Sequence, residues 1–200
     1  MLFRSPPWDE VVYWALDLET GGLDPGRDPI LAVGMVPVRE GRIRLGEAWR
    51  TLVRPPSGAR ITPESVPSHQ LVWEEVREAP PVGEVLPEVV RRLSGNVLLV
   101  HHRGIDVAFL REACRRTGVR WPAPPVVDTV DLLLRLAKRA RFATPDLPLV
   151  VPPLNLSQAR EAHGLPPYQA HDALTDALAT AELMLVLRHA LRARTLRDLR

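Results

Sequence analysis

The sequence contains little cysteine or lysine and no long hydrophobic run. Cys114 is the only cysteine, so no internal disulfide can form, and we expect a plain buried or half-buried thiol in a helix. No apolar run approaches the ~20 residues that cross a bilayer, and the first residues lack the apolar core of a signal peptide. These absences argue against a disulfide scaffold and a membrane-spanning protein. We therefore expect a cytoplasmic protein without membrane partners.

Basic and acidic residues are nearly balanced. There are 26 lysines and arginines, of which only Lys138 is lysine, against 24 aspartates and glutamates, so the net charge is +2 and the pI about 9.2. This balance permits a nucleic-acid ligand without requiring one. The length of 200 residues and the apolar fraction of 46% are typical of one globular domain. Since no internal repeat or dividing linker is evident, we expect a single domain over residues 1–200.

Apolar periodicity predicts a three-strand meander followed by alternating helices and strands. This order is typical of an α/β fold with a mixed central sheet flanked by helices. Strands are expected at residues 11–18, 30–38, 43–53, 97–101 and 125–128, with a tight reversal at Gly41. Helices are expected at residues 84–93, 106–117, 129–141 and 154–162, and the longest helix within 172–194. Short helical turns are expected in residues 62–81, and an irregular insertion at 144–153.

Two carboxylates end the first predicted strand, in the sequence WALDLETGGL of residues 14–23. Because strand side chains alternate, Asp17 and Glu19 project from one face of the strand and Leu16 and Leu18 from the other. Burying carboxylates without a compensating charge is costly, and a divalent cation would offset that cost. The spacing alone is a weak signal, so an exposed strand end that happens to be acidic is the alternative.

Two further segments contribute acids and a histidine. Asp106 falls in the first turn of a predicted helix, where an acid could equally serve to stabilise the helix N-terminus. His171 and Asp176 are five positions apart, which is roughly 140° of rotation on a regular helix. We therefore expect His171 in the approach to the last helix and Asp176 in the second turn. Taken singly, His171 could be a surface or capping residue and Asp176 an ordinary solvent-facing one.

Carboxylates without cysteine form the donor set that hard cations such as Mg²⁺ select. A histidine beside such a cluster can move a proton near neutral pH. The two features together indicate metal-assisted hydrolysis of phosphodiesters.

The order and context of these segments are more specific than any one of them. LDLETGGLDP at 16–25, HHRGIDVAFL at 101–110 and HDALTDALAT at 171–180 resemble the three sequence motifs of the DEDDh family of 3′–5′ exonucleases. That family includes proofreading subunits of bacterial replicative polymerases. The resemblance runs from about residue 11 to about residue 190. It implies a ribonuclease H-like fold and two bound divalent ions, Mg²⁺ or Mn²⁺.

The motif match also implies a role for each acidic residue and for the histidine. Asp17, Glu19, Asp106 and Asp176 would hold the metal ions, and His171 would be the general base. A pair of ions could activate a water molecule and stabilise the departing 3′ oxygen, while His171 would accept the proton from that water.

The resemblance further implies a place for the substrate. The backbone of Thr20, Gly21 and Leu23 would hold the terminal nucleotide, with Leu23 against a base. His101 matches a family histidine on the substrate side of the site. We interpret His101 as structural support for the site rather than as a metal ligand.

The chain departs from the family pattern in the second motif. His102 and Arg103 replace a common asparagine and a common small residue, and Ile105 replaces a common phenylalanine. Arg103 could contact a substrate phosphate or form an exposed ion pair. Asp128, which follows this motif along the chain, is expected to have a capping or structural role.

The third motif can be assigned to a second pair of residues. Tyr168 and Asp172 have the spacing of the related tyrosine-type exonucleases. The residues around His171 and Asp176 fit the histidine type better, so we favour the histidine type.

The sequence thus predicts a metal-dependent 3′–5′ exonuclease that releases nucleoside 5′-monophosphates from single-stranded ends, with DNA favoured over RNA. An RNA-trimming exoribonuclease and a non-catalytic nucleic-acid-binding module on the same fold are the alternatives. A DNA polymerase or a repair protein is a candidate partner. Because the segment after Leu191 is short, we expect a free-standing nuclease or one that docks through its domain surface.

Overall fold

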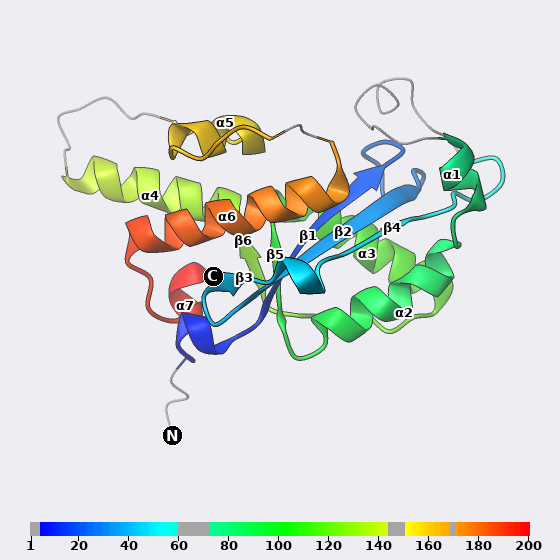
Figure 1. The fold of residues 1–200 in the computed structure, drawn as a ribbon, viewed down its shortest axis with the longest axis horizontal. Helices are drawn as coiled ribbons and strands as arrows, with labels where there is room; N and C mark the ends of the chain where they lie inside the picture. The colour runs from blue at the N-terminus through cyan, green and yellow to red at the C-terminus, as the bar shows by residue number, and fades with distance from the viewer. Residues whose placement is uncertain (1–4, 60–72, 144–150, 169–170) are drawn as a thin grey trace.

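One mixed β-sheet organises the protein. The computed structural model describes residues 5–59, 73–143, 151–168 and 171–200. The sheet order is β3-β2-β1-β5-β6, and β4 also pairs with β2 (Figure 1). The strands are β1 (Tyr13–Thr20), β2 (Ile30–Arg39), β3 (Arg42–Ile43), β4 (Trp49–Leu52), β5 (Val97–Val100) and β6 (Val126–Asp128). Strands β5 and β6 run parallel to β1, whereas β2 is antiparallel to β1 and to both β3 and β4.

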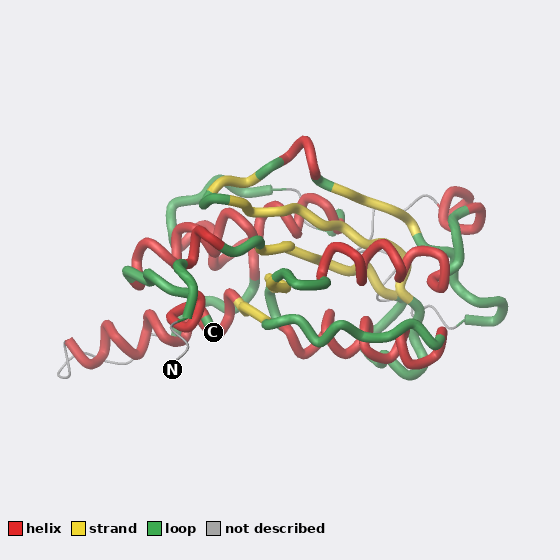
Figure 2. Tube along the Cα trace, turned by 90° about the horizontal axis from the view of Figure 1, so that it is seen from below, coloured by secondary structure: helices red, strands yellow, loops and turns green. Residues whose placement is uncertain are grey.

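Helices cover both faces of the sheet, as Figures 1 and 2 show. They are α1 (Trp73–Glu78), α2 (Val82–Leu93), α3 (Arg103–Thr117), α4 (Thr129–Ala143), α5 (Leu156–Ala162), α6 (Ala173–Leu191) and α7 (Leu196–Leu199), with the short 3-10 helices η1 (Trp8–Glu10) and η2 (Leu45–Glu47). Tyr13 and Ala15 pack in a core with α4 and α6, whereas Leu16 and Leu18 pack in a second core with α2 and α3. The alternation along β1 therefore divides the two cores.

The predicted fold class is confirmed, and most predicted elements lie within a few residues of their expected positions. The turn between β2 and β3 lies at Glu40 and Gly41, which both have positive φ. Cys114 is buried in α3, and burial raises the pKa of its thiol. Helix α1 is one short helix within the segment expected to hold helical turns, and residues 62–72 of that segment lie outside the described residues. Of the expected irregular insertion, only residues 151–153 are described, and they form no helix or strand.

One predicted strand was wrong in its middle. Residues 43–53 do not form a continuous strand, because η2 separates β3 from β4. The apolar alternation stops at Gly46, a residue that strands disfavour, and Leu45 is exposed. The Glu47 carboxylate accepts a hydrogen bond from the Arg39 guanidinium on β2. This interruption restarts the edge of the sheet as β4 beside the middle of β2.

The end of the chain adds a helix that sequence reasoning did not predict. Helix α6 ends at Leu191, because Arg192 adopts a left-handed conformation with φ of 53°. The chain then turns into α7, where Leu196 and Leu199 complete the core beneath α4 and α6. No helix in the described part of the chain has both the length and the apolarity that crossing a bilayer requires.

Candidate active site

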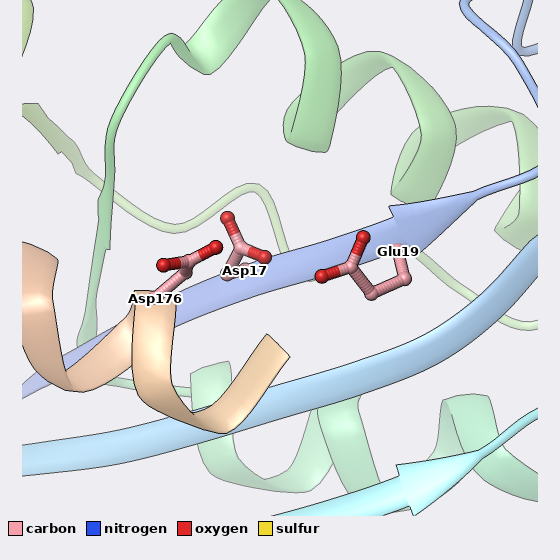
Figure 3. A group of neighbouring side chains, drawn as sticks. All are labelled: Asp17, Glu19 and Asp176. Atoms are coloured by element: carbon pink, nitrogen blue, oxygen red, sulfur yellow. The ribbon is translucent and has the colours of Figure 1, made fainter. Parts of the chain in front are cut away.

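Three carboxylates meet near the end of β1, on the face of the sheet that α6 covers (Figure 3). Asp17 and Glu19 project from β1, and Asp176 comes from the first turn of α6, one turn earlier than predicted. Each residue offers an oxygen atom, and these oxygens lie within 4.8 Å of one another. Glu19 is buried, while Asp17 and Asp176 are partly exposed. The acidic group is therefore accessible from one side.

Asp106 approaches Asp17 from α3. It is 4% exposed and lies in the first turn of that helix. It is not part of the group of three, yet its charge raises the pKa of Asp17 more than any other charge does. Strand β5 pairs with β1 only as far as Ala15. Beyond that point the Asp106 carboxylate accepts a hydrogen bond from the backbone N–H of Leu18, which ties α3 to the acidic end of β1.

Burial raises the pKa of three of these acids. For Asp17 the pKa lies well above its usual range, and the charges of Asp106 and Glu19 raise it further. The pKa of Asp106 rises to about 8, although its hydrogen bonds with backbone N–H groups favour the charged form. Burial also raises the pKa of Asp176, although the hydrogen bond from the backbone N–H of His171 acts to lower it. The largest charge effects on Asp17 all come from carboxylates, so the group suits a divalent cation.

Gly34 allows α6 to reach the sheet. It stands opposite Asp17 on β1 and opposite Arg50 on β4. A Cβ atom on Gly34 would lie 2.1 Å from the carbonyl oxygen of Ala173, where α6 begins. Only a residue without a side chain permits this docking, which brings Asp176 to Asp17. Sequence reasoning missed Gly34, although a glycine inside an apolar strand signals a close backbone approach.

An ion pair holds the same end of α6. Asp172 caps the helix by accepting hydrogen bonds from the backbone N–H and the hydroxyl of Thr175, each 3.0 Å long. The other carboxylate oxygen of Asp172 lies 3.1 Å from Nε of Arg50. The neighbouring positions Gly34 and Arg50 thus both anchor the start of α6.

His171 lies just before this cap, in the approach to α6 as expected. Its backbone is left-handed, with φ of 71°, so the residue is not helical. The rotation per residue of a regular helix, which would turn it away from Asp176, therefore does not apply. The backbone N–H of His171 donates a 2.9 Å hydrogen bond to Oδ2 of Asp176. The residue is exposed. His171 is therefore tethered to the acidic group and open to solvent.

The structure favours the assignment of the third motif to His171 and Asp176 over its assignment to Tyr168 and Asp172. The Tyr168 hydroxyl donates a 3.0 Å hydrogen bond to Glu182, and the guanidinium of Arg160 covers the tyrosine ring. Asp172 serves as the cap of α6. Asp176, and not Asp172, joins the acidic group.

His101 connects three segments behind the acidic group. Its Nδ1 lies 2.7 Å from the Thr129 hydroxyl, and its Nε2 lies 2.8 Å from the carbonyl oxygen of Leu154. Because a carbonyl can only accept, Nε2 carries a hydrogen. Burial lowers the pKa of the ring, which favours the neutral form. With both nitrogens bonded to protein atoms, His101 is placed as a support between β5, α4 and the segment before α5.

Asp128 has the structural role expected of it. Its buried carboxylate accepts hydrogen bonds from the backbone N–H groups of His102 and Arg103 at the start of α3. The Arg103 side chain forms an exposed ion pair with Asp131 at 3.2 Å. The departures in the second motif therefore leave the start of α3, and with it Asp106, fixed by Asp128.

The segment after β1 forms a tight loop that points one side chain outward. The Thr20 hydroxyl donates a 2.7 Å hydrogen bond to the carbonyl of Gly22. A Cβ atom on Gly22 would lie 2.2 Å from the carboxylate of Asp28, which would then have to move. Gly21 donates its N–H to the carbonyl of Pro29. Leu23 is 80% exposed, which makes it available to a ligand beside the acidic group.

Fold and site together define a nuclease of the ribonuclease H-like class. The model of the exonuclease family RNase_T matches residues 14–184, so the chain belongs to this family. The resemblance to 3′–5′ exonucleases is therefore confirmed at the level of the family. Exonucleases of this family depend on divalent metal ions, and the acidic group fits that requirement.

Among known relatives, an epsilon-like protein of DNA polymerase III from Rhodobacter capsulatus is 34% identical over 95% of this chain and 25% of its own length. The PolC-type DNA polymerase III of Thermotoga petrophila is 29% identical over 89% of this chain and 12% of its own length. The chain thus spans a quarter or less of these relatives. In fold it is similar to Escherichia coli exonuclease I in complex with a dT13 oligonucleotide, with a TM-score of 0.74 and 17% identity, over 91% of this chain and 42% of that one.

Raised carboxyl pKa values predict that the metal-free protein loses stability as the pH rises. A carboxyl group whose pKa is higher in the folded state than in the unfolded state contributes stability at low pH. This stability is lost as the pH rises through the folded-state pKa. For Asp106 this window runs from the ordinary value of 3.8 to about 8. Asp106→Asn keeps an acceptor for the Leu18 N–H but cannot ionise. Its metal-free melting temperature at pH 8 should exceed that of the wild type, by about 2–4 °C for each kcal/mol gained.

Thermal melts at pH 5 and pH 8, with EDTA or with Mn²⁺, measure this effect. Metal binding releases protons from acids with raised pKa, so Mn²⁺ should stabilise the wild type more at pH 8 than at pH 5. The stabilisation by Mn²⁺ should be smaller in Asp106→Asn. Wild-type melting temperatures that do not depend on pH in EDTA would contradict the expectation.

The contact at Gly34 predicts that Gly34→Ala displaces the start of α6. Asp176 would then move away from Asp17 and Glu19, and Mn²⁺ affinity should fall by about 10–100-fold, as for other residues that orient metal ligands. Mn²⁺ titration followed by melting temperature measures the affinity. Gly46→Ala is the matched control, because a Cβ atom there meets nothing within 4 Å. A folded Gly34→Ala variant with wild-type Mn²⁺ affinity would refute the docking role.

Proposed function

We propose that the protein is a 3′–5′ exonuclease that removes nucleoside 5′-monophosphates from single-stranded ends, with DNA favoured. The observation that carries the proposal is the convergence of Asp17, Glu19 and Asp176, with His171 hydrogen-bonded to Asp176. A base tethered to an acidic, solvent-accessible group is the arrangement that hydrolysis by an activated water requires. Membership of the exonuclease family supports the same reaction.

In this proposal Asp17, Glu19, Asp106 and Asp176 hold two divalent ions, Mg²⁺ or Mn²⁺. When bound, the ions supply positive charge that favours the attacking hydroxide and the leaving oxygen. The side chains alone explain why the ions are needed, because burial and mutual repulsion hold the pKa values of Asp17 and Asp106 above their usual range.

His171 is the proposed general base. It accepts a proton from water as the water oxygen attacks the terminal phosphorus, and the bond between phosphorus and the 3′ oxygen of the preceding nucleotide breaks. The left-handed backbone and the N–H bond to Asp176 limit where the exposed imidazole can lie. The terminal nucleotide lies along Thr20 and Gly21, with its base against exposed Leu23. His101, held by Thr129 and Leu154, is the proposed structural support for the substrate.

DNA is the favoured substrate because the relatives carry names of DNA polymerases and the solved relative contains a DNA oligonucleotide. Those names also make a DNA polymerase or repair protein a candidate partner. An RNA-trimming exoribonuclease differs only in substrate. A non-catalytic binding module is the other alternative, and the four acids and histidine argue against it, because such a module needs none of them.

A cleavage assay separates these functions. Incubation of 5′-labelled single-stranded DNA or RNA with Mg²⁺ or Mn²⁺ should produce a ladder that shortens from the 3′ end, faster for DNA. Asp17→Asn should abolish the ladder, because it removes a central metal ligand without changing side-chain size. Binding without cleavage by the wild type would identify the non-catalytic module, and faster shortening of RNA would identify the exoribonuclease.

The general-base assignment predicts that His171→Ala lowers kcat by about 10²–10⁴-fold, the usual effect of losing a general base. The affinity for Mn²⁺ should change little, since the four carboxylates stay in place. His189→Ala is the control, because His189 is an exposed histidine at the opposite end of α6. Steady-state turnover on single-stranded DNA measures the effect, and wild-type turnover in His171→Ala would remove His171 from the mechanism.

A further inference from the structure

Two adjoining hollows lie beyond the end of β1, around the loop of residues 21–29. The first has a volume of about 230 Å³ and the second about 410 Å³. Both are lined by Asp28, Pro29, Pro56 and Arg116, so the two hollows adjoin and are treated together. We call the pair the arginine hollow. The loop that bounds it is the one expected to hold the terminal nucleotide.

The arginine hollow is built from continuations of the site's own elements. Ile30 lines it and pairs with Thr20, the residue after Glu19 on β1. Phe109 lines it too, and lies one helical turn after Asp106 on α3. Both belong to the core beneath α2 and α3. The hollow therefore lies on the α2 and α3 side of the sheet, whereas the acidic group lies on the face that α6 covers. Leu23, in the loop that follows β1, is exposed to solvent.

The charge of the hollow suits an anion. Arg54 and Arg116 are exposed, and in the described part of the chain neither has an ion pair. Arg27 lines the second hollow and has only an exposed 3.5 Å contact with Asp24. Among the described lining residues Asp28 is the single acid, and its carboxylate already accepts the backbone N–H of Asp24. Unpaired arginines are strong ligands for phosphate.

The apolar part of the hollow suits a nucleobase or sugar. Its apolar lining includes prolines from two loops, Pro25 and Pro56, together with Ile30 and Val82. Flat apolar surfaces beside arginines are the combination that sequence-tolerant binding of single strands uses.

We infer that the arginine hollow binds the single strand on the 5′ side of the nucleotide being removed. The single-stranded nucleic acid passes from the acidic group around the side chain of Leu23, and its phosphates form ion pairs with Arg54 and Arg116. This inference rests on the proposed function, and it adds a binding site that the hydrolytic residues do not form. Its consequence is that long substrates gain affinity from interactions that a dinucleotide cannot make.

The test compares a dinucleotide with an oligothymidylate of about a dozen nucleotides. In the double variant Arg54→Gln/Arg116→Gln, KM for the long substrate should rise about tenfold, while kcat and KM for the dinucleotide stay unchanged. The salt dependence of log KM for the long substrate should weaken by about 0.7 for each phosphate that the double variant no longer neutralises. Melting temperatures check that the variants fold.

The control is Arg115→Gln, which removes an adjacent arginine of α3 that pairs with Glu112 instead of lining the hollow. An equal effect of this control, or an unchanged KM and salt dependence in the double variant, would overturn the inference. Fluorescence anisotropy of a labelled oligothymidylate in EDTA keeps the two proposals apart. Weaker binding by the double variant without any wild-type cleavage would support the hollow and refute the nuclease, whereas cleavage with no change in binding would do the reverse.

Discussion

Electrostatic repulsion among buried carboxylates is the constraint on which the site depends. Asp17, the central acid, feels four other carboxylates in addition to burial, and a fold that gathers such groups needs something to hold them together. Two helices supply part of this, because α3 and α6 both place an acid in their first turn. The partial positive charge at a helix N-terminus favours a nearby carboxylate. Backbone N–H groups of Leu18 and His171 add direct hydrogen bonds, and divalent ions would supply the remaining compensation.

The Asp176 carboxylate links the acidic group to the placement of His171. Oδ2 of Asp176 accepts the N–H of His171, so Asp176, which would hold an ion under the proposed function, also fixes the backbone that carries the imidazole. Gly34 and the ion pair between Arg50 and Asp172 limit the opposite movement, away from the sheet. The position of His171 is therefore determined by the sheet through the start of α6.

The sequence predicted that Asp17, Glu19 and Asp176 come together, as the structure shows, but it did not predict how they are brought together. Period-two alternation placed Asp17 and Glu19 on one face, and the rotation between His171 and Asp176 required a non-helical residue, which the left-handed φ of His171 provides. Gly34 could not be assigned, because its role depends on a contact with Ala173, which is remote in sequence. For a similar reason η2 was missed, since local propensity alone did not reveal that the sheet edge restarts at β4.

The acids Asp17 and Glu19 and the loop that follows them both belong to, or directly continue, strand β1. β1 lies between β2 and β5 in the sheet, but beyond Ala15 only β2 pairs with it, and its next residues form the loop around Gly22 and Asp28. Under the proposed function, a nucleotide on that loop would lie only a few residues along the chain from Asp17 and Glu19. The acids from α3 and α6 arrive from helices that pack on opposite faces of the sheet. Loss of packing on either face would therefore separate an acid from β1, so the acidic group requires both cores.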